Sequence, residues 1–468
     1  MAATRRTLIK RTLQILAVLA AAGLAFVVVY ILPTASGYAA KNACSSVFVA
    51  GLSEERISAE ELKAVPYASF SVDRENKRVR ASVVGLAART AVFREGLGCA
   101  VAVDVEPDSL TDFAFEPPAA QLDEAPWPRG NRADDRPDPP GLDRAGLDAA
   151  VAAAFDEPDP DSLRHTRAVV VVQGGRLLAE RYAADIDAST PLLGWSMTKS
   201  VTGAMVGILV GRGELDPAAP APVPQWRNDA RKDVTLDQLL RMSSGLEFEE
   251  VYGPLTDATH MLFEVDDAAA IALAKPLAKP PDSEFSYSSG TTNILSWIVR
   301  QRFATVGEYH RFPYESLFAP LGMSSATMET DASGTFVGSS FLYATARDWA
   351  RFGELYLRDG MWRGQRILPE GWAAYSGAAT PTAKRGEYAA QFWANAGAKD
   401  DPSDRKLPHV PTDAFWASGF QGQAVLIVPS RDAVLVRLGL THDRAAWDLD
   451  AFASSVLATL PPTSGAGT

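Results

Sequence analysis

The sequence predicts an α+β fold that follows an N-terminal membrane-spanning helix. Three features lead to this prediction: a long apolar run near the N-terminus, hairpin-forming strand pairs at both ends of residues 146–460, and a mostly helical stretch between those pairs. Strands at both ends of a domain with helices inserted between them are typical of an antiparallel sheet flanked by helices. The inserted stretch then forms a mostly helical subdomain.

Composition and charge exclude several classes of protein. The 468 residues are 47% hydrophobic and 22% charged, which is ordinary for packed globular protein and unlike a disordered or multi-span membrane chain. The net charge of −12 repels phosphate backbones, so nucleic acid is not an expected partner. With five scattered His, two Cys and no HxH or HExxH pattern, no metal site is expected.

The apolar run over residues 13–32 is long enough to span a bilayer core of about 30 Å. Residues 1–12 contain four basic residues and form the predicted cytoplasmic segment. By the positive-inside rule, everything after the span lies outside the cytoplasm. We therefore expect a single-pass protein of the bacterial inner membrane whose catalytic domain is periplasmic.

Export with a cleaved signal is the alternative. Thr4-Arg5-Arg6 and the residues up to Lys10 resemble a twin-arginine export signal. Gly37-Tyr38-Ala39 would serve as a small-residue cleavage site. The apolar run is longer than that of most cleaved signals, which favours the uncleaved anchor.

Cys44 and Cys99 are the only two cysteines, and both follow the predicted span. In an oxidising periplasm they can pair, so we expect a disulfide. Two buried free thiols are the alternative.

The rest of the chain divides into three regions. Residues 43–115 are a small β-rich region, residues 116–145 are a Pro- and Asp-rich linker or strap, and residues 146–460 are the main domain. The strand-like stretches of the β-rich region are Val47–Ala50, Phe70–Val72, Val79–Val84 and Val101–Val105.

Two hairpins bound the main domain. Arg167–Gln173 and Arg176–Tyr182 flank Gly174-Gly175, a sequence typical of a tight hairpin turn. Gln423–Val428 and Ala433–Leu438 form the second pair. Helices are expected at Leu147–Phe155, before the first hairpin, and at Trp447–Leu460, after the second.

Ser196 and Lys199 are the candidate nucleophile and base. A strongly apolar helix follows Ser196, so its hydroxyl lies at a helix N-terminus, where backbone N–H groups favour developing negative charge. Lys199 lies one turn further along the same face. A lysine in such a dry place tends to lose its proton, and a neutral amine beside a serine hydroxyl is a plausible general base. A pattern this short also arises by chance, and Ser200 or Thr198 could equally be a simple helix cap.

Two further stretches supply candidate groups. Tyr287 and Ser289 lie two residues apart. The tyrosine can donate or accept a proton, and the serine can hydrogen-bond a lysine. The simpler alternative is an ordinary helix start with serine caps. Gly419 permits close approach of a ligand, and the N–H of Phe420 can complete an oxyanion hole with that of Ser196. A plain Gly-rich turn is the alternative there.

The order of these elements resembles the serine β-lactamase and penicillin-binding-protein superfamily. The stretch Leu239-Leu240-Arg241-Met242-Ser243-Ser244-Gly245-Leu246 is similar to its LLxMxSGL segment, and Pro320-Leu321-Gly322-Met323 is similar to its PLGM. Within the superfamily the chain is most similar to 6-aminohexanoate-dimer hydrolases and class C-like esterases. The resemblance implies a β-lactamase/transpeptidase-like fold over about residues 147–460.

The chain departs from β-lactamases at two positions. Ala417-Ser418-Gly419 stands where they have Lys-Thr-Gly, and Ser289 stands where class C enzymes have Asn. The first departure removes the basic side chain that grips a substrate carboxylate. Both favour a small-molecule linear amide or ester as substrate.

The resemblance also implies a mechanism. Ser196 attacks the carbonyl, Lys199 with Tyr287 nearby takes its proton, and the N–H groups of Ser196 and Phe420 hold the oxyanion. Ser289 and Gly419 support the site, and no cofactor is needed. Tyr252, in a loop expected over the pocket, is the candidate substrate contact, with a solvated acidic loop as the alternative.

Two other functions stay open at this point. One is a non-catalytic module that binds cell-wall peptides, and the other is a β-lactamase or D-Ala-D-Ala carboxypeptidase. The sequence does not decide the oligomeric state.

Overall fold

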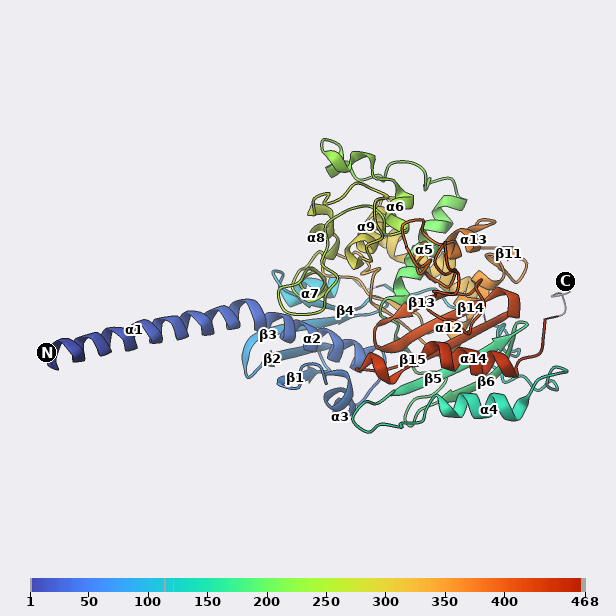
Figure 1. Cartoon of the computed structure of the whole chain (residues 1–468), viewed down its shortest axis with the longest axis horizontal. Coiled ribbons are helices and arrows are strands. Elements are labelled where there is room, and N and C mark those ends of the chain that lie inside the picture. Colours follow the sequence, from blue (N-terminus) through green and yellow to red (C-terminus); the bar gives the residue numbers. More distant parts are fainter. Residues whose placement is uncertain (1, 113–114, 121, 464–468) are drawn as a thin grey trace.

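The structure is a computed structural model that describes residues 2–112, 115–120 and 122–463, with side chains from Leu8 onward (Figure 1). Residues 113–114 of the predicted β-rich region and residue 121 of the predicted strap lie outside the described residues. One long helix, α1, projects from a body that contains all the strands.

The largest sheet has six antiparallel strands in the order β12-β13-β14-β15-β5-β6. Both predicted hairpins are present, and the second strand of the C-terminal pair lies beside the first strand of the N-terminal pair, with Val436 opposite Val170. The chain thus closes its two ends onto one sheet, which confirms the predicted α+β fold. The strands are β5 (Thr166–Gln173), β6 (Arg176–Tyr182), β12 (Trp393–Ala394), β13 (Phe415–Gly419), β14 (Gln423–Val428) and β15 (Ala433–Gly439).

Helices cover both faces of this sheet. In β5, Val169 and Val171 belong to the core under the terminal helices α4 and α14, whereas Val170 and Val172 belong to the core under α5 and α12. This alternation is the period of two that a strand imposes. The flanking helices are α4 (Arg144–Ala153), α5 (Met197–Gly211), α12 (Ala346–Leu357) and α14 (Leu449–Thr459).

A helical part lies between α5 and α12 in the chain and above the sheet in Figure 1. Its α9 packs against α5, α6 and α8, and so holds residues 289–293 close to the start of α5. Its helices are α6 (Leu236–Leu240), α7 (Asp257–Phe263), α8 (Ala268–Ala274), α9 (Ser289–Arg300), α10 (Val306–Pro313) and α11 (Ala319–Leu321). Short elements elsewhere are β7 (Leu192–Leu193), β8 (Thr327–Met328), β9 (Leu342–Ala344), β10 (Met361–Trp362), β11 (Gln365–Arg366) and α13 (Trp372–Gly377).

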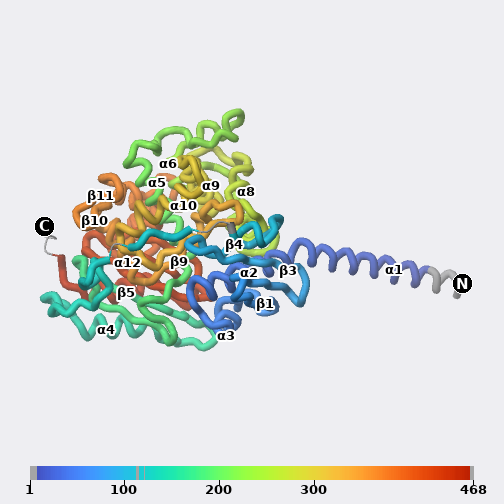
Figure 2. The backbone as a smooth tube through the Cα atoms, turned by 180° about the vertical axis from the view of Figure 1, so that it is seen from behind, coloured from blue at the N-terminus to red at the C-terminus, as the bar shows by residue number. Residues whose placement is uncertain are grey.

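The N-terminal helix has an exposed half and a buried half. α1 (Ala2–Phe26) and the π-helical turn η1 (Val27–Ile31) run without a break into α2 (Leu32–Phe48). The segment from Leu8 is long and apolar enough to cross a membrane. α2 is instead packed inside the body, as Figure 2 shows from behind. The strand predicted at Val47–Ala50 is wrong, because these residues end this helix and the turn after it.

A four-stranded antiparallel sheet packs on α2, in the order β1-β2-β3-β4. The predicted disulfide is present, and it joins Cys44 of α2 to Cys99 of β4. The strands are β1 (Ala68–Asp73), β2 (Arg78–Val83), β3 (Leu86–Arg94) and β4 (Gly98–Ala102), and the short helix α3 (Glu54–Arg56) precedes them.

A buried ion pair fastens α2 to the main domain. The Nζ of Lys41 donates to the carboxylate of Glu329, which is fully buried just after β8. The same carboxylate accepts from the Oγ of Ser45 at 2.7 Å and from the backbone N–H of Cys99 at 2.7 Å. Three hydrogen bonds thus compensate its desolvation, and one carboxylate holds α2, β4 and the main domain together.

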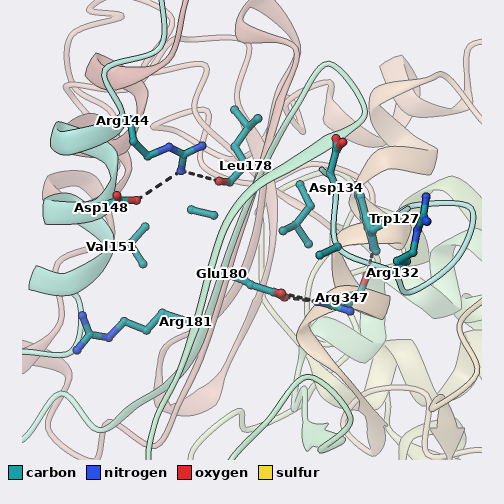
Figure 3. A pocket seen from close by; sticks show the side chains of 13 residues that line it. Trp127, Arg132, Asp134, Arg144, Asp148, Val151, Leu178, Glu180, Arg181 and Arg347 are labelled. Atoms are coloured by element: carbon teal, nitrogen blue, oxygen red, sulfur yellow. Dashed lines mark hydrogen bonds and ion pairs between the residues drawn. The ribbon is translucent and has the colours of Figure 1, made fainter. Parts of the chain in front are cut away.

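Part of the Pro- and Asp-rich segment lies along β6, where a cavity of about 450 Å³ separates the two (Figure 3). Arg347 of α12 donates to the backbone oxygen of Asn131 in the segment at 2.7 Å, and Asp134 of the segment accepts from Arg176 of β6 at 2.9 Å. Trp127 donates to the backbone oxygen of Arg347 at 3.3 Å. These contacts attach the segment to the main domain.

The ion pair predicts a large loss of stability when one partner is removed. Glu329→Gln leaves Lys41 charged and uncompensated, so we expect the free energy of unfolding to fall by about 3–5 kcal/mol. Urea denaturation of the full chain in detergent measures it. The double variant Lys41→Met/Glu329→Gln removes both charges and should recover part of the loss. Glu284→Gln, which breaks an exposed pair with Lys279, should cost less than about 1 kcal/mol. Equal effects of Glu329→Gln and Glu284→Gln would contradict the assignment.

Candidate active site

Ser196 stands at the N-cap of α5, with its side chain half-buried. The helix that follows is buried along nearly its whole length, so its start is fixed by packing on all sides. The residue before the serine, Trp195, has a positive φ of 48°, which costs a non-glycine residue about 1–2 kcal/mol. A hydrogen bond of 3.1 Å from the indole Nε1 of Trp195 to the Oε1 of Gln421 helps hold this turn.

Lys199 has three polar partners and is 1% exposed. Its Nζ lies 3.0 Å from the Oγ of Ser196, 2.9 Å from the Oγ of Ser289 and 3.0 Å from the backbone oxygen of Ser339. The Oγ of Ser289 donates its own proton to Glu250 at 2.6 Å, so toward Lys199 it can only accept. A neutral amine has two N–H bonds and one lone pair. Ser289 and Ser339 take the two N–H bonds, which leaves the lone pair for the hydroxyl of Ser196.

Burial lowers the pKa of Lys199 to about 8, and the negative charge of Glu250 opposes this shift. The amine is therefore mostly protonated at neutral pH and becomes neutral through pH 8. The direction of this shift agrees with the sequence-based expectation that a lysine in so dry a place tends to lose its proton. Glu250 limits the shift, because its charge stabilises the ammonium.

Tyr287 lies beside Lys199 within an aromatic cluster. Its ring centroid is 4.9 Å from the Nζ of Lys199 and 5.4 Å from the ring of Trp393. Burial, and then the charge of Glu250, raise the pKa of Tyr287 far above its usual value, while a hydrogen bond with Ser196 lowers it slightly. The phenol thus keeps its proton at any ordinary pH, which suits a proton donor rather than an initial base.

Glu250 is a site residue that sequence reasoning did not single out. Its carboxylate accepts from the backbone N–H of Ser289 at 2.6 Å and from the hydroxyl of Tyr252 at 3.1 Å, besides the Oγ of Ser289. It therefore fixes both the first turn of α9 and the loop that follows Leu246. The signal in the sequence was weak, because Glu247, Glu249 and Glu250 are equivalent acidic residues until the backbone shows which one points inward.

Gly419 allows the sheet edge to approach the nucleophile. A Cβ at this position would lie 2.1 Å from the backbone oxygen of Gly194, two residues before Ser196. Phe420 follows in a short 3-10 turn, and its ring lies edge-on to Trp195 at 5.7 Å. This close approach places Phe420 beside the turn that carries Ser196, and the oxyanion hole of their two N–H groups stays a prediction.

A cavity of about 520 Å³ opens over these residues. Tyr252, the expected substrate contact, lines it, as do Ser196, Tyr287, Gly419 and Phe420. Two exposed cations that sequence reasoning missed, Lys406 and Arg444, also reach it from loops on either side of the C-terminal hairpin. The cavity therefore has positive charge although Ala417 offers none.

The expected residues thus come together around one cavity, with Ser289 directly behind Lys199. Among the described residues, no group of three or more His, Cys, Asp or Glu is placed to hold a metal ion.

The fold is β-lactamase/transpeptidase-like, and it places Ser196, Lys199 and Tyr287 beside one another. The family model described as Beta-lactamase matches residues 151–444, well over half of the chain. The protein belongs to this family.

Several known proteins with similar sequences or folds are hydrolases. The 6-aminohexanoate-dimer hydrolase of Paenarthrobacter ureafaciens is 26% identical over 307 residues, which cover 59% of this chain and 73% of that protein. A family VIII carboxylesterase has a TM-score of 0.53 at 16% identity, covering 69% of this chain and 97% of its own. The hydrolase EstCE1 has a TM-score of 0.53 at 15% identity, covering 67% and 97%. At these identities the solved structures show the shared fold.

The pKa of Lys199 predicts how reactivity depends on pH. Only the neutral amine accepts a proton, so the rate at which a fluorophosphonate labels Ser196 should rise with pH, with a midpoint near 8. Glu250→Gln removes the charge that stabilises the ammonium, which lowers the pKa of Lys199, so the midpoint should move to lower pH. Glu249→Gln, on an exposed neighbour in the same loop, is the matched control and should leave it unchanged. A midpoint that stays or rises in Glu250→Gln would refute this electrostatic role.

The contact at Gly419 predicts that a single methyl group disturbs the site. Gly419→Ala forces the strand away from Gly194, and a displacement of about 1 Å can cost roughly 100-fold in rate. Gly307→Ala, in α10, meets nothing within 4 Å and serves as the control. Labelling rates of the two variants at equal temperature make the comparison. Similar rates in both would show that this close approach does not matter.

Proposed function

We propose that this protein is a membrane-anchored, periplasmic serine hydrolase that cleaves linear amides or esters through an acyl-enzyme on Ser196. The observation that carries the proposal is the set of contacts of Lys199. In the neutral form of the amine, its two N–H bonds have acceptors at Ser289 and Ser339, which leaves its lone pair for the hydroxyl of Ser196, 3.0 Å away. A buried amine with this geometry is suited to general-base work.

In the proposed reaction Ser196 Oγ attacks the substrate carbonyl while its proton passes to Lys199. The N–H groups of Ser196 and Phe420 hold the oxyanion. The leaving alcohol or amine departs with a proton from Tyr287, which Lys199 can restore. Water then attacks the acyl-enzyme with Lys199 as base, which releases the acid and returns Ser196 to its starting form.

The anchor is proposed to stay uncleaved. Gly37 lies in the buried helix α2, where a Cβ would be 2.3 Å from the backbone oxygen of Phe263, and Ala39 is fully buried. Cleavage at this point would remove the first half of a helix that packs against α7. The basic residues before the span favour a periplasmic domain. The disulfide is consistent with this location, because disulfides form and persist in oxidising compartments.

A β-lactamase or D-Ala-D-Ala carboxypeptidase is the second candidate. Lys406 and Arg444 favour it, because cations beside the site can bind a substrate carboxylate. Against it stands Ala417, whose methyl group offers no such charge on the strand itself. The non-catalytic peptide-binding module has no specific structural observation in its favour.

A substrate panel tests the proposal. We expect the full chain to hydrolyse small p-nitrophenyl esters or anilides, and Ser196→Ala to lower kcat/KM by about 10⁴-fold or more. Lys199→Met should have a comparable effect. Ser200→Ala, on the next buried hydroxyl, is the control, because its Oγ donates to the backbone of Gln391 outside the site.

The outcomes separate the three functions. Nitrocefin turnover that matches or exceeds ester turnover would favour the β-lactamase. Binding of cell-wall peptides with no turnover, unchanged in Ser196→Ala, would favour the binding module and overturn the proposed hydrolase.

A further inference from the structure

A second cavity, of about 310 Å³, adjoins the active site on the side of the membrane helix. Its volume falls at the lower end of the range of about 300–1,000 Å³ typical of small-molecule sites. Apolar and small side chains dominate its wall. Ile31 comes from the end of the span, and Leu32 and Ala35 come from the start of α2. The turn before β1 contributes Ala64, Val65 and Tyr67. The remaining wall includes Pro254 from the loop before α7, Phe263 from α7 and Trp195 from the active site.

This apolar cavity meets the catalytic cavity at two residues. Tyr252 and Phe420 line both, and their rings stack at 5.9 Å with an interplanar angle of 18°. Trp195, next to the nucleophile in the chain, lines the apolar cavity as well. The two cavities therefore adjoin at this aromatic pair, on the side of Trp195.

The other end of the apolar cavity lies where the span enters the body. Large side chains are exposed along the helix up to Tyr30, and Pro33 is already buried. Ile31 and Leu32, at this transition, line the cavity. With the exposed half of the helix in a bilayer, the cavity lies at the membrane surface.

Exposed apolar side chains surround the same place. Outside the N-terminal helix, the described residues have exposed large apolar side chains in three places only. These are Tyr67, the β2–β3 hairpin and the loop 251–255. Tyr67 and this loop line the cavity, and β3 packs against η1. Figure 1 places the hairpin and α7 beside the point where α1 leaves the body, and Figure 2 shows β3 at the same point from behind. An apolar rim restricted to one face marks an interaction surface, here with lipid.

We propose that the apolar cavity binds the long acyl chain of an ester or amide drawn from the membrane in which the protein is anchored. This inference rests on the proposed hydrolase function and names its substrate class. The acyl chain lies toward Trp195 and Ile31, and the head group leaves through the cavity lined by Tyr287, Lys406 and Arg444. Hydrolysis adds one water across the carbonyl–head-group bond and releases a long-chain acid and the free head group.

Chain-length dependence tests the proposal. The full chain in lipid nanodiscs is assayed on p-nitrophenyl esters whose acyl groups run from four to twelve carbons. We expect kcat/KM to rise by about two- to fourfold for each added methylene until the cavity is filled. Ala64→Trp, at an exposed position on the cavity wall, should lower the ratio of long-chain to short-chain kcat/KM at least about tenfold.

Controls keep the result interpretable. Ala270→Trp, at an exposed position of α8 outside the cavity, should keep the wild-type ratio. Ala64→Leu, a milder change, should lower the ratio less than Ala64→Trp and guards against misfolding. Because partition of esters into the nanodisc is the same for all variants, only the cavity changes between them.

A second arm asks where the substrate comes from. A long-chain ester placed in the same nanodisc as the enzyme should be hydrolysed faster than the same ester in separate protein-free vesicles. Equal rates would overturn the membrane source.

The outcomes also distinguish this proposal from the one on which it rests. Turnover of short esters that depends on Ser196, with a ratio unchanged in Ala64→Trp, would overturn the acyl site and leave the hydrolase intact. Absence of turnover of every ester would overturn both.

Discussion

The burial of one amine organises the active site. Lys199 is held in a nearly dry position by the packing of α5, and its hydrogen bonds reach three separate parts of the chain: the start of its own helix, the start of α9 and the turn at Ser339. Burial lowers its pKa and Glu250 limits the fall, so the group stays close to the point at which it can both take and return a proton. The proposed acylation and deacylation steps need both directions of proton transfer, and a pKa near 8 suits both.

Much of this arrangement follows from local sequence pattern. The apolar helix after Ser196 predicts a buried lysine, and both hairpins of the sheet are visible in their turn residues and strand-like flanks. The order of motifs along the chain then fixes how the helical part is inserted. Short-range rules suffice here because helix period and turn chemistry are local properties.

Other features escaped sequence reasoning for a physical reason. Glu250 acts through a loop whose conformation depends on tertiary contacts, and no periodicity selects it from its acidic neighbours. Lys406 and Arg444 reach the catalytic cavity from long loops, so their approach to Ser196 is a property of the fold alone. The stretch Val47–Ala50 has the composition of a strand, yet its tertiary context keeps it at the end of a helix.

The N-terminal helix has two halves with different surroundings, because the side chains of the first half are exposed and those of α2 are mostly buried in the body. One residue pattern suits lipid up to Tyr30, and a second, richer in Ala, Ser and Gly, lets other elements pack closely on α2. Since no loop separates the halves, the direction of α1 and the position of the active site are mechanically linked. The buried pair of Lys41 and Glu329 and the disulfide of Cys44 make that link rigid. A flexible tether would let the domain turn freely above a bilayer. In the membrane-anchored protein that we propose, this rigid connection instead keeps the same apolar face, with its cavity beside Ser196, toward the membrane surface. The proposed anchor then does more than retain the protein, since it also orients the proposed catalytic centre.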